Sequence, residues 1–319
     1  MSEHIAIIEA IKSGSMDEGD IAELSDILGL AEVAITSGND EVVAVLKSVC
    51  DSAGAHFIEF REAQSKGDVE ASMIAINKSL KAARDAKNRD HYLEARARME
   101  LGLLKFTQGE IDDSGVDIKW AMERLSAVSP GSSAHGVSIL NMAAWHEARG
   151  EPIMALAQHA SISRVGEHSP GVVAISRSNA ARICVQIGDI VTALRHSWVS
   201  FSMALEQGMD ELTLDSGLVW IDLALSEVNE EATRMEELVL SAAPRELGDN
   251  PKAWAHPEDL RFVVERCSSL WNRPMDGSRR PDIMVLLEGE AACGFTSFHK
   301  SVNASDEVED EVVLGLIQG

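Results

Sequence analysis

A glycine followed by an acidic residue recurs four times along the chain, each time between two stretches whose apolar residues repeat with helical spacing. The copies are Gly67-Asp68, Gly109-Glu110, Gly150-Glu151 and Gly188-Asp189, and the steps between them are 42, 41 and 38 residues. Glycine adopts the left-handed conformation that ends a helix, and an acidic residue after it caps or charges the start of the next helix. This repeat of about 40 residues predicts stacked helical hairpins, which form an α-solenoid.

The composition agrees with an all-α fold. The apolar residues are mainly Ala, Ile, Leu, Val and Met, with 4% aromatic residues and 8 prolines in 319 residues. Such a mixture favours helices over sheets. Within Glu41–Phe60, for example, apolar residues recur at steps of three and four, and no stretch of comparable length alternates with a period of two.

The copies resemble the tetratricopeptide repeat, whose unit is a pair of antiparallel helices. Leu101 and Gly102 occupy the family's Leu-Gly positions in the copy around Gly109, and Ser114 stands at a site where the family has alanine. Small residues occupy further family positions at Ala121, Ala143, Ala155, Ala181 and Ala193. Pro130 and Pro170 close their copies later than in the 34-residue form, which predicts second helices about one turn longer. The resemblance spans roughly residues 88–207, is weaker for 40–87 and 208–244, and implies a right-handed solenoid with a concave groove.

Three segments are expected on this basis. Residues 1–39 form an N-terminal helical cap with helices near Ile5–Lys12 and Ile21–Thr36, and residues 40–244 form the repeat array. Residues 245–319 form an extension of mixed helix and loop, with a helix near Pro257–Trp271 and an acidic tail. The tail from Ser305 is either a closing amphipathic helix or a docking segment, and the sequence favours neither.

The net charge of −24 excludes a typical nucleic-acid binder, which needs a basic surface. An acidic surface suits solubility, a saline cytoplasm or a basic partner, and composition does not separate these. No apolar run reaches the length of a membrane span, and the N-terminus lacks the pattern of a signal peptide. The four cysteines form no Cys-x-x-Cys pair. We therefore expect a cytoplasmic protein without membrane contact.

The resemblance also implies a binding face on the first helix of each pair. Asn141 and Asn179 occupy the same inward-facing position in successive copies, where asparagines of several relatives hold the backbone of an extended peptide. Arg182, Arg177 and Arg96, with Arg98, are candidates for holding an acidic side chain or a C-terminal carboxylate. The alternative is structural: the asparagines satisfy helix contacts and the arginines pair with nearby acids. Met99 and Leu103 replace the residues of the family's chaperone-tail clamp, which disfavours that ligand.

No catalytic motif is present: the sequence lacks phosphate-binding glycine loops, a Gly-x-Ser-x-Gly elbow and a helical zinc motif. We therefore predict no catalytic residue, no metal site and no cofactor. The sequence favours an adaptor that holds a peptide or protein partner of unknown identity in a concave groove. Two alternatives stay open: an acidic decoy or chaperone-like protein that binds a basic partner on its outer surface, or a regulatory or enzymatic role for residues 245–319.

Overall fold

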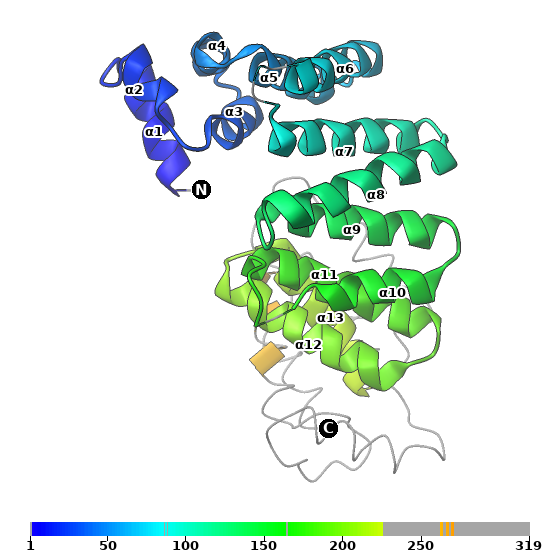
Figure 1. Cartoon of the computed structure of the whole chain (residues 1–319). Helices are drawn as coiled ribbons and strands as arrows, with labels where there is room; N and C mark the ends of the chain where they lie inside the picture. The colour runs from blue at the N-terminus through cyan, green and yellow to red at the C-terminus, as the bar shows by residue number, and fades with distance from the viewer. Residues whose placement is uncertain are drawn as a thin grey trace. The chain divides into compact units, whose positions relative to one another are not determined.

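The computed structural model describes residues 2–85, 87, 89–163 and 165–225, together with 262–263, 266–267 and 269–270. Every regular element within these ranges is a helix, as the composition predicts (Figure 1). The helices are α1 (Ser2–Lys12), α2 (Glu18–Ala22), α3 (Ile27–Thr36), α4 (Asp40–Val49), α5 (Ser52–Ser65), α6 (Val69–Asp85), α7 (His91–Thr107), α8 (Ile111–Val128), α9 (Ser133–Ala148), α10 (Pro152–Ser161), α11 (Pro170–Gln186), α12 (Ile190–Glu206) and α13 (Asp210–Leu225). None of the described helices is long and apolar enough to cross a membrane.

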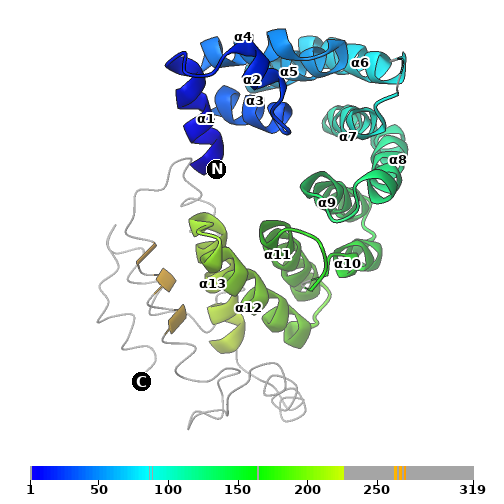
Figure 2. The same cartoon turned by 60° about the vertical axis from the view of Figure 1, so that its left-hand side comes forward.

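The chain divides into two compact units, residues 1–145 and 146–319, and α9 spans the division. In the first unit α5 packs against α6 and α7 against α8, and in the second unit α11 packs against α12 and α12 against α13. Figure 1 shows α7 and α8 side by side, and Figure 2 shows the group α11, α12 and α13. Within each unit, consecutive helices therefore pack against each other, so that first and second helices alternate.

One backbone motif makes the turns within the helix pairs. Gly67, Gly109, Gly150 and Gly188 have φ values of 70°, 84°, 72° and 81°. At Gly109 the glycine N–H donates to the carbonyl of Phe106 (3.0 Å) and the following N–H donates to the carbonyl of Lys105 (3.0 Å). This is the Schellman pattern, and the other three turns repeat it. Two of the free carbonyls at the end of each first helix are thereby satisfied by main-chain N–H groups.

Gly38 makes a further copy of this turn between α3 and α4. Its φ is 69°, and the N–H of Asn39 donates to the carbonyl of Ala34 (2.9 Å). The sequence repeat misses this copy because asparagine, and not an acidic residue, follows the glycine. The pair α3–α4 therefore belongs to the same pattern as the later pairs.

Small residues lie where paired helices approach closely. Ala143, Ala155, Ala181 and Ala193 are at most 1% exposed, as expected. At Gly102 in α7, a Cβ atom would lie 2.9 Å from Cγ1 of Ile118 and 3.1 Å from the carbonyl oxygen of Ser114, both in α8. The absence of a side chain at Gly102 therefore sets how closely α7 and α8 approach.

Three helix boundaries differ from the expectation. The helix expected over Ile21–Thr36 is split, because Asp26 leaves helical geometry and its side chain accepts the N–H of Gly29 to start α3. The helical spacing over Glu41–Phe60 is split in the same way by Asp51, which accepts the N–H of Gly54 and starts α5. In both places a capping aspartate interrupts a continuous apolar pattern.

The third difference concerns the second helices, which are expected to be long. The helices α6, α8 and α12 contain 17, 18 and 17 residues, but α10 contains only 10. The chain leaves α10 at Ile162, which is extended and buried. The delay before Pro170 is therefore a loop in this copy and not an additional helical turn.

The described residues of 262–270 are helical and lie within the helix expected over Pro257–Trp271. They pack on α12 and α13 within the second unit: Phe262 meets Phe201 of α12 edge to face at 6.0 Å between ring centroids, and Cys267 faces Gly217 of α13. The remaining expectations for 245–319, including the acidic tail from Ser305, lie outside the described residues.

Candidate functional site

A groove with a volume of about 390 Å³ lies between α11 and the start of α13, within the second unit. It is lined by Ile175, Ser178, Asn179 and Arg182 of α11 and by Met209, Asp210, Glu211, Leu212 and Asp215. Two of the five residues predicted to bind a peptide, Asn179 and Arg182, are therefore neighbours in one groove.

Helical spacing and a glycine turn bring these walls together. Ile175, Asn179 and Arg182 are spaced by four and three residues, which places them on one face of α11. The opposite wall begins directly after Gly208, whose φ is 66°. The N–H of Met209 donates to the carbonyl of Ala204 (2.9 Å), so the turn directs the first residues of α13 toward α11.

The polar groups of α11 are already ordered with respect to each other. Nη2 of Arg182 donates to Oδ1 of Asn179 (2.6 Å). The amide oxygen of Asn179 is thus occupied, while its NH₂ group donates no hydrogen bond within the part of the chain that the structure describes. A ligand in this groove therefore meets hydrogen-bond donors from both side chains.

The charge of the groove is mixed, with an excess of acid. Asp210, Glu211 and Asp215 contribute three carboxylates, and Arg182 contributes one guanidinium. Burial raises the pKa of Glu147, and the positive charge of Arg182 opposes that rise. Arg182 therefore also interacts with an acid on α9, which reduces the charge it offers to a ligand.

Asn141 lies on α9 in the first unit, nine residues before Gly150, as Asn179 lies nine residues before Gly188. The side chain is half-buried, and its Nδ2 atom is buried without a hydrogen-bond partner among the described residues. Asn141 and Asn179 thus hold equivalent positions in two repeats, and each has an amide nitrogen that remains to be satisfied.

Arg177 has a different task from the one expected. Its Nη1 and Nη2 atoms donate to the carbonyl oxygens of His159 (3.3 Å) and Ile162 (2.6 Å), at the end of α10. The carbonyl of His159 also accepts the N–H of Ile162 (3.2 Å), and Arg177 is the donor to the carbonyl of Ile162 itself. Arg177 therefore links α11 to the end of α10 by hydrogen bonds, and it is not part of the candidate site.

Arg96 and Arg98 are also paired within the first unit. Nη2 of Arg96 donates to Oε1 of Glu32 (2.8 Å), and Nε of Arg98 donates to Oδ1 of Asp117 (2.7 Å). The guanidinium of Arg98 also lies over the ring of Trp120, 4.5 Å from its centroid. The structure thus places both Arg96 and Arg98 in ion pairs within the first unit.

Sequence reasoning identified Arg182 but missed that charged residues occupy the same position on two other first helices. Glu32, Arg61 and Arg182 each lie six residues before a turn glycine: Gly38, Gly67 and Gly188. Glu100 lies nine residues before Gly109, the position that Asn141 and Asn179 occupy in their repeats. Counting back from every glycine turn, including Gly38, is the sequence signal that identifies these residues.

The described residues contain no group of three or more His, Cys, Asp or Glu side chains that could hold a metal ion. In the comparisons with known proteins, no family model matches the chain and no curated protein matches its sequence.

Proposed function

We propose that this chain is an adaptor built as a tetratricopeptide-like α-solenoid, which binds a peptide or protein partner on its first helices. The observation that carries the proposal is the pairing of Asn179 with Arg182 in the groove between α11 and α13. The repeated glycine turns and the equivalent position of Asn141 support it. The proposed role is binding alone and requires neither a cofactor nor a metal.

The groove offers the two kinds of contact that an extended peptide needs. The NH₂ group of Asn179 can donate to a peptide carbonyl, whatever side chain that residue carries. Ile175, Met209 and Leu212 supply an apolar wall for one side chain of the ligand. Affinity would come from the peptide backbone, and specificity from the apolar wall and the charges around it.

The second candidate is recognition of a basic partner. It is favoured by the net charge of −24 and by the three carboxylates that line the same groove. Ionic strength separates the two candidates, because interactions between exposed charges weaken as the screening length falls to ~8 Å at physiological salt. Binding through the peptide backbone should largely persist in high salt, and binding through the acidic surface should not.

The test is a comparison of partner capture by wild type, the double variant Asn141→Ala/Asn179→Ala and the control Gln186→Ala. Each hydrogen bond lost is worth roughly 0.5–1.5 kcal/mol, so the double variant should bind an isolated partner about tenfold more weakly or worse. Gln186 is an exposed residue of α11 outside the groove and should bind like wild type. Circular dichroism should show unchanged helix content in all three proteins.

The variant Arg182→Ala tests whether the ligand is acidic. It should weaken binding further only if the ligand is acidic, and this effect should shrink in high salt. A partner whose affinity ignores both asparagines and falls steeply with salt would contradict the groove proposal and support the basic-partner alternative.

A further inference from the structure

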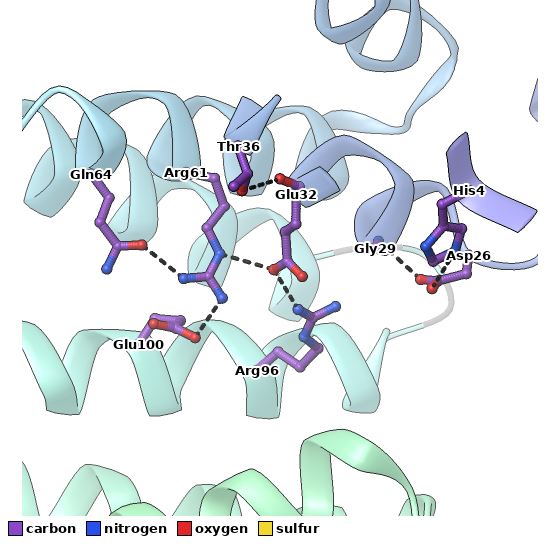
Figure 3. A network of polar contacts seen from close by, with 9 residues as sticks. All are labelled: His4, Asp26, Gly29, Glu32, Thr36, Arg61, Gln64, Arg96 and Glu100. Atoms are coloured by element: carbon purple, nitrogen blue, oxygen red, sulfur yellow. Dashed lines mark hydrogen bonds and ion pairs between the residues drawn. The ribbon is translucent and has the colours of Figure 1, made fainter. Parts of the chain in front are cut away.

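Two arginines of the first unit converge on a single carboxylate oxygen. Oε1 of Glu32 in α3 accepts hydrogen bonds from Nε of Arg61 in α5 (2.9 Å) and from Nη2 of Arg96 in α7 (2.8 Å). Arg61 also donates through Nη2 to Oε1 of Glu100 (2.8 Å) and through Nη1 to Oε1 of Gln64 (2.8 Å). Figure 3 shows these side chains arriving from three helices at one point.

The guanidinium groups of Arg61 and Arg96 both pack against aromatic rings. Arg61 lies 5.3 Å from the ring centroid of Phe57 and 5.2 Å from that of Phe60, and Arg96 lies 4.8 Å from that of Phe57. Both rings are buried in the core formed by α5, α6 and α7. Cation–π contacts and ring packing therefore fix the arginines independently of the carboxylate that they bind.

The two acids of this cluster differ in exposure. The side chain of Glu100 is 5% exposed, and burial raises the pKa of its carboxyl group. The side chain of Glu32 is 32% exposed. Glu100 is thus the buried counter-charge of Arg61. The carboxylate of Glu32, which is partly exposed, balances Arg96 at the surface.

A groove with a volume of about 240 Å³ opens directly beside Glu32. It is lined by Glu32, Ile35, Thr36, Arg61, Gln64 and Ser65. The helix α3 is anchored by the buried residues Leu30, Ala31 and Ala34, which are at most 1% exposed. Arg61 lines this groove itself, and a rotation of the Glu32 side chain would free the donors of Arg61 and Arg96 that now bind Oε1 of Glu32, without moving α3.

From this geometry we infer that Arg61 and Arg96 form a carboxylate-binding site, and that Glu32 is its exchangeable internal occupant. The ligand is an acidic segment of a peptide that lies in the groove beside Glu32. One of its side-chain carboxylates replaces that of Glu32 on the two guanidiniums, which are suited to this task by their planar arrangement of donors. Glu32 competes with the ligand and so sets the affinity of the site. This inference does not depend on the Asn179 groove.

The test measures binding of a fluorescein-labelled hexaglutamate peptide by fluorescence anisotropy at low salt. Wild type should bind it weakly, and Glu32→Gln should bind it at least tenfold more tightly, because the competing carboxylate is removed. The double variant Glu32→Gln/Arg96→Gln should lose this gain. Labelled hexalysine serves as the peptide control, and its affinity should not rise in Glu32→Gln.

The matched control variant is Glu62→Gln. Glu62 of α5 pairs with Lys47 of α4 at 2.8 Å. This change therefore also removes one negative charge and frees one cation, the ammonium group of Lys47. Equal affinity for hexaglutamate in Glu62→Gln and Glu32→Gln, or no gain in Glu32→Gln over wild type, would overturn the inference. Glu32→Asp, which keeps the charge on a shorter side chain, should give an intermediate affinity and provides the same test if Glu32→Gln does not fold. The gain of Glu32→Gln over wild type should have the same size in the Asn141→Ala/Asn179→Ala background, which separates this site from the proposed partner groove.

Discussion

The length of the acidic side chain after a turn glycine determines whether that side chain caps the next helix. Asp68 and Asp189 accept backbone N–H groups three residues ahead, from Ala71 (2.9 Å) and Thr192 (3.1 Å). Glu110 and Glu151 form no such cap. The shorter aspartate side chain reaches the first turn of the next helix, whereas the glutamate side chain does not cap it and places its charge near the helix start. Second helices that follow aspartate therefore begin with a side-chain cap that those after glutamate lack.

Two adjacent alanines of α9 provide a test of packing at single-residue resolution. Ala143 is buried and Ala144 is exposed. Ala143→Leu should lower the free energy of unfolding by about 1–3 kcal/mol, because the larger side chain forces neighbouring helices apart. Ala144→Leu, with the same change in volume and helix propensity, should alter it by less than about 0.5 kcal/mol. Urea titrations of both variants give the comparison, and equal losses would show that close helix packing does not depend on Ala143.

At the scale of the element, α10 differs from the long second helices. It is shorter than α6, α8 and α12, and its last carbonyls are bound by the guanidinium of Arg177 on α11. A neighbouring helix thus provides the capping group that a longer helix or a glycine turn provides elsewhere in the chain. The end of α10 therefore depends on the side chain at a single position.

Arg177→Ala should destabilise the second unit. The change removes the donor to the buried carbonyl of Ile162, at a cost of about 1–3 kcal/mol, whereas the carbonyl of His159 keeps the N–H of Ile162 (3.2 Å) and the hydroxyl of Ser176 (3.4 Å). Arg177→Lys keeps the charge but lacks the planar pair of donors, so it should recover only part of the loss. Thermal unfolding followed by circular dichroism gives the order wild type, lysine, alanine. Equal stability of wild type and the alanine variant would mean that water satisfies these carbonyls equally well.

The elements show which kinds of structure a sequence pattern can predict. Helical spacing and glycine turns are local, so they predicted the helices and the turns at Gly67, Gly109, Gly150 and Gly188. The split at Asp51 was missed because the apolar spacing continues across it. The early end of α10 was missed because its capping group comes from Arg177, 15 residues beyond Ile162. Long-range contacts of this kind leave no periodic mark in the sequence.

The same limit applies to the candidate sites. The positions of Asn179 and Arg182 followed from the resemblance, and the structure brings the two side chains together. The ion pair of Arg96 with Glu32 joins residues 64 positions apart, and neither residue identifies the other in the sequence. Arginines that the sequence offers as ligand contacts are in this case bound by the acids of the chain itself.

For the molecule as a whole, pH should act through two histidines of the second unit, the buried His159 and the half-buried His196. Burial, and then the positive charge of Arg177, lowers the pKa of both His159 and His196 from 6.5 to about 4. An unfolded chain holds these groups near 6.5, so between pH 6.5 and 4 it binds more protons than the folded chain. Stability from this source is therefore complete above pH 6.5 and falls as the pH drops toward 4.

Urea titrations at pH 7, 6 and 5 should show this loss directly. Protonation of His159 in the unfolded chain should by itself lower the free energy of unfolding by on the order of 1–2 kcal/mol at pH 5 relative to pH 7. His159→Gln keeps a polar group beside Ser176, the hydroxyl that contacts Nδ1 of His159 at 3.2 Å, and should show a weaker dependence on pH. The same slope in the variant and in wild type would assign the acid sensitivity to other groups.

The glycine turns also bear on how this chain can change in length. Each turn closes on main-chain groups within six residues, so it does not depend on how many residues separate it from the next turn. The steps of 42, 41 and 38 residues differ through the connecting segments and helix lengths, while the turns stay the same. A single inserted residue within α11, in contrast, would rotate Asn179 and Arg182 by about 100° relative to each other or to Gly188. Whole hairpins are therefore the tolerated unit of insertion and deletion, and one-residue changes inside a first helix should be the most damaging.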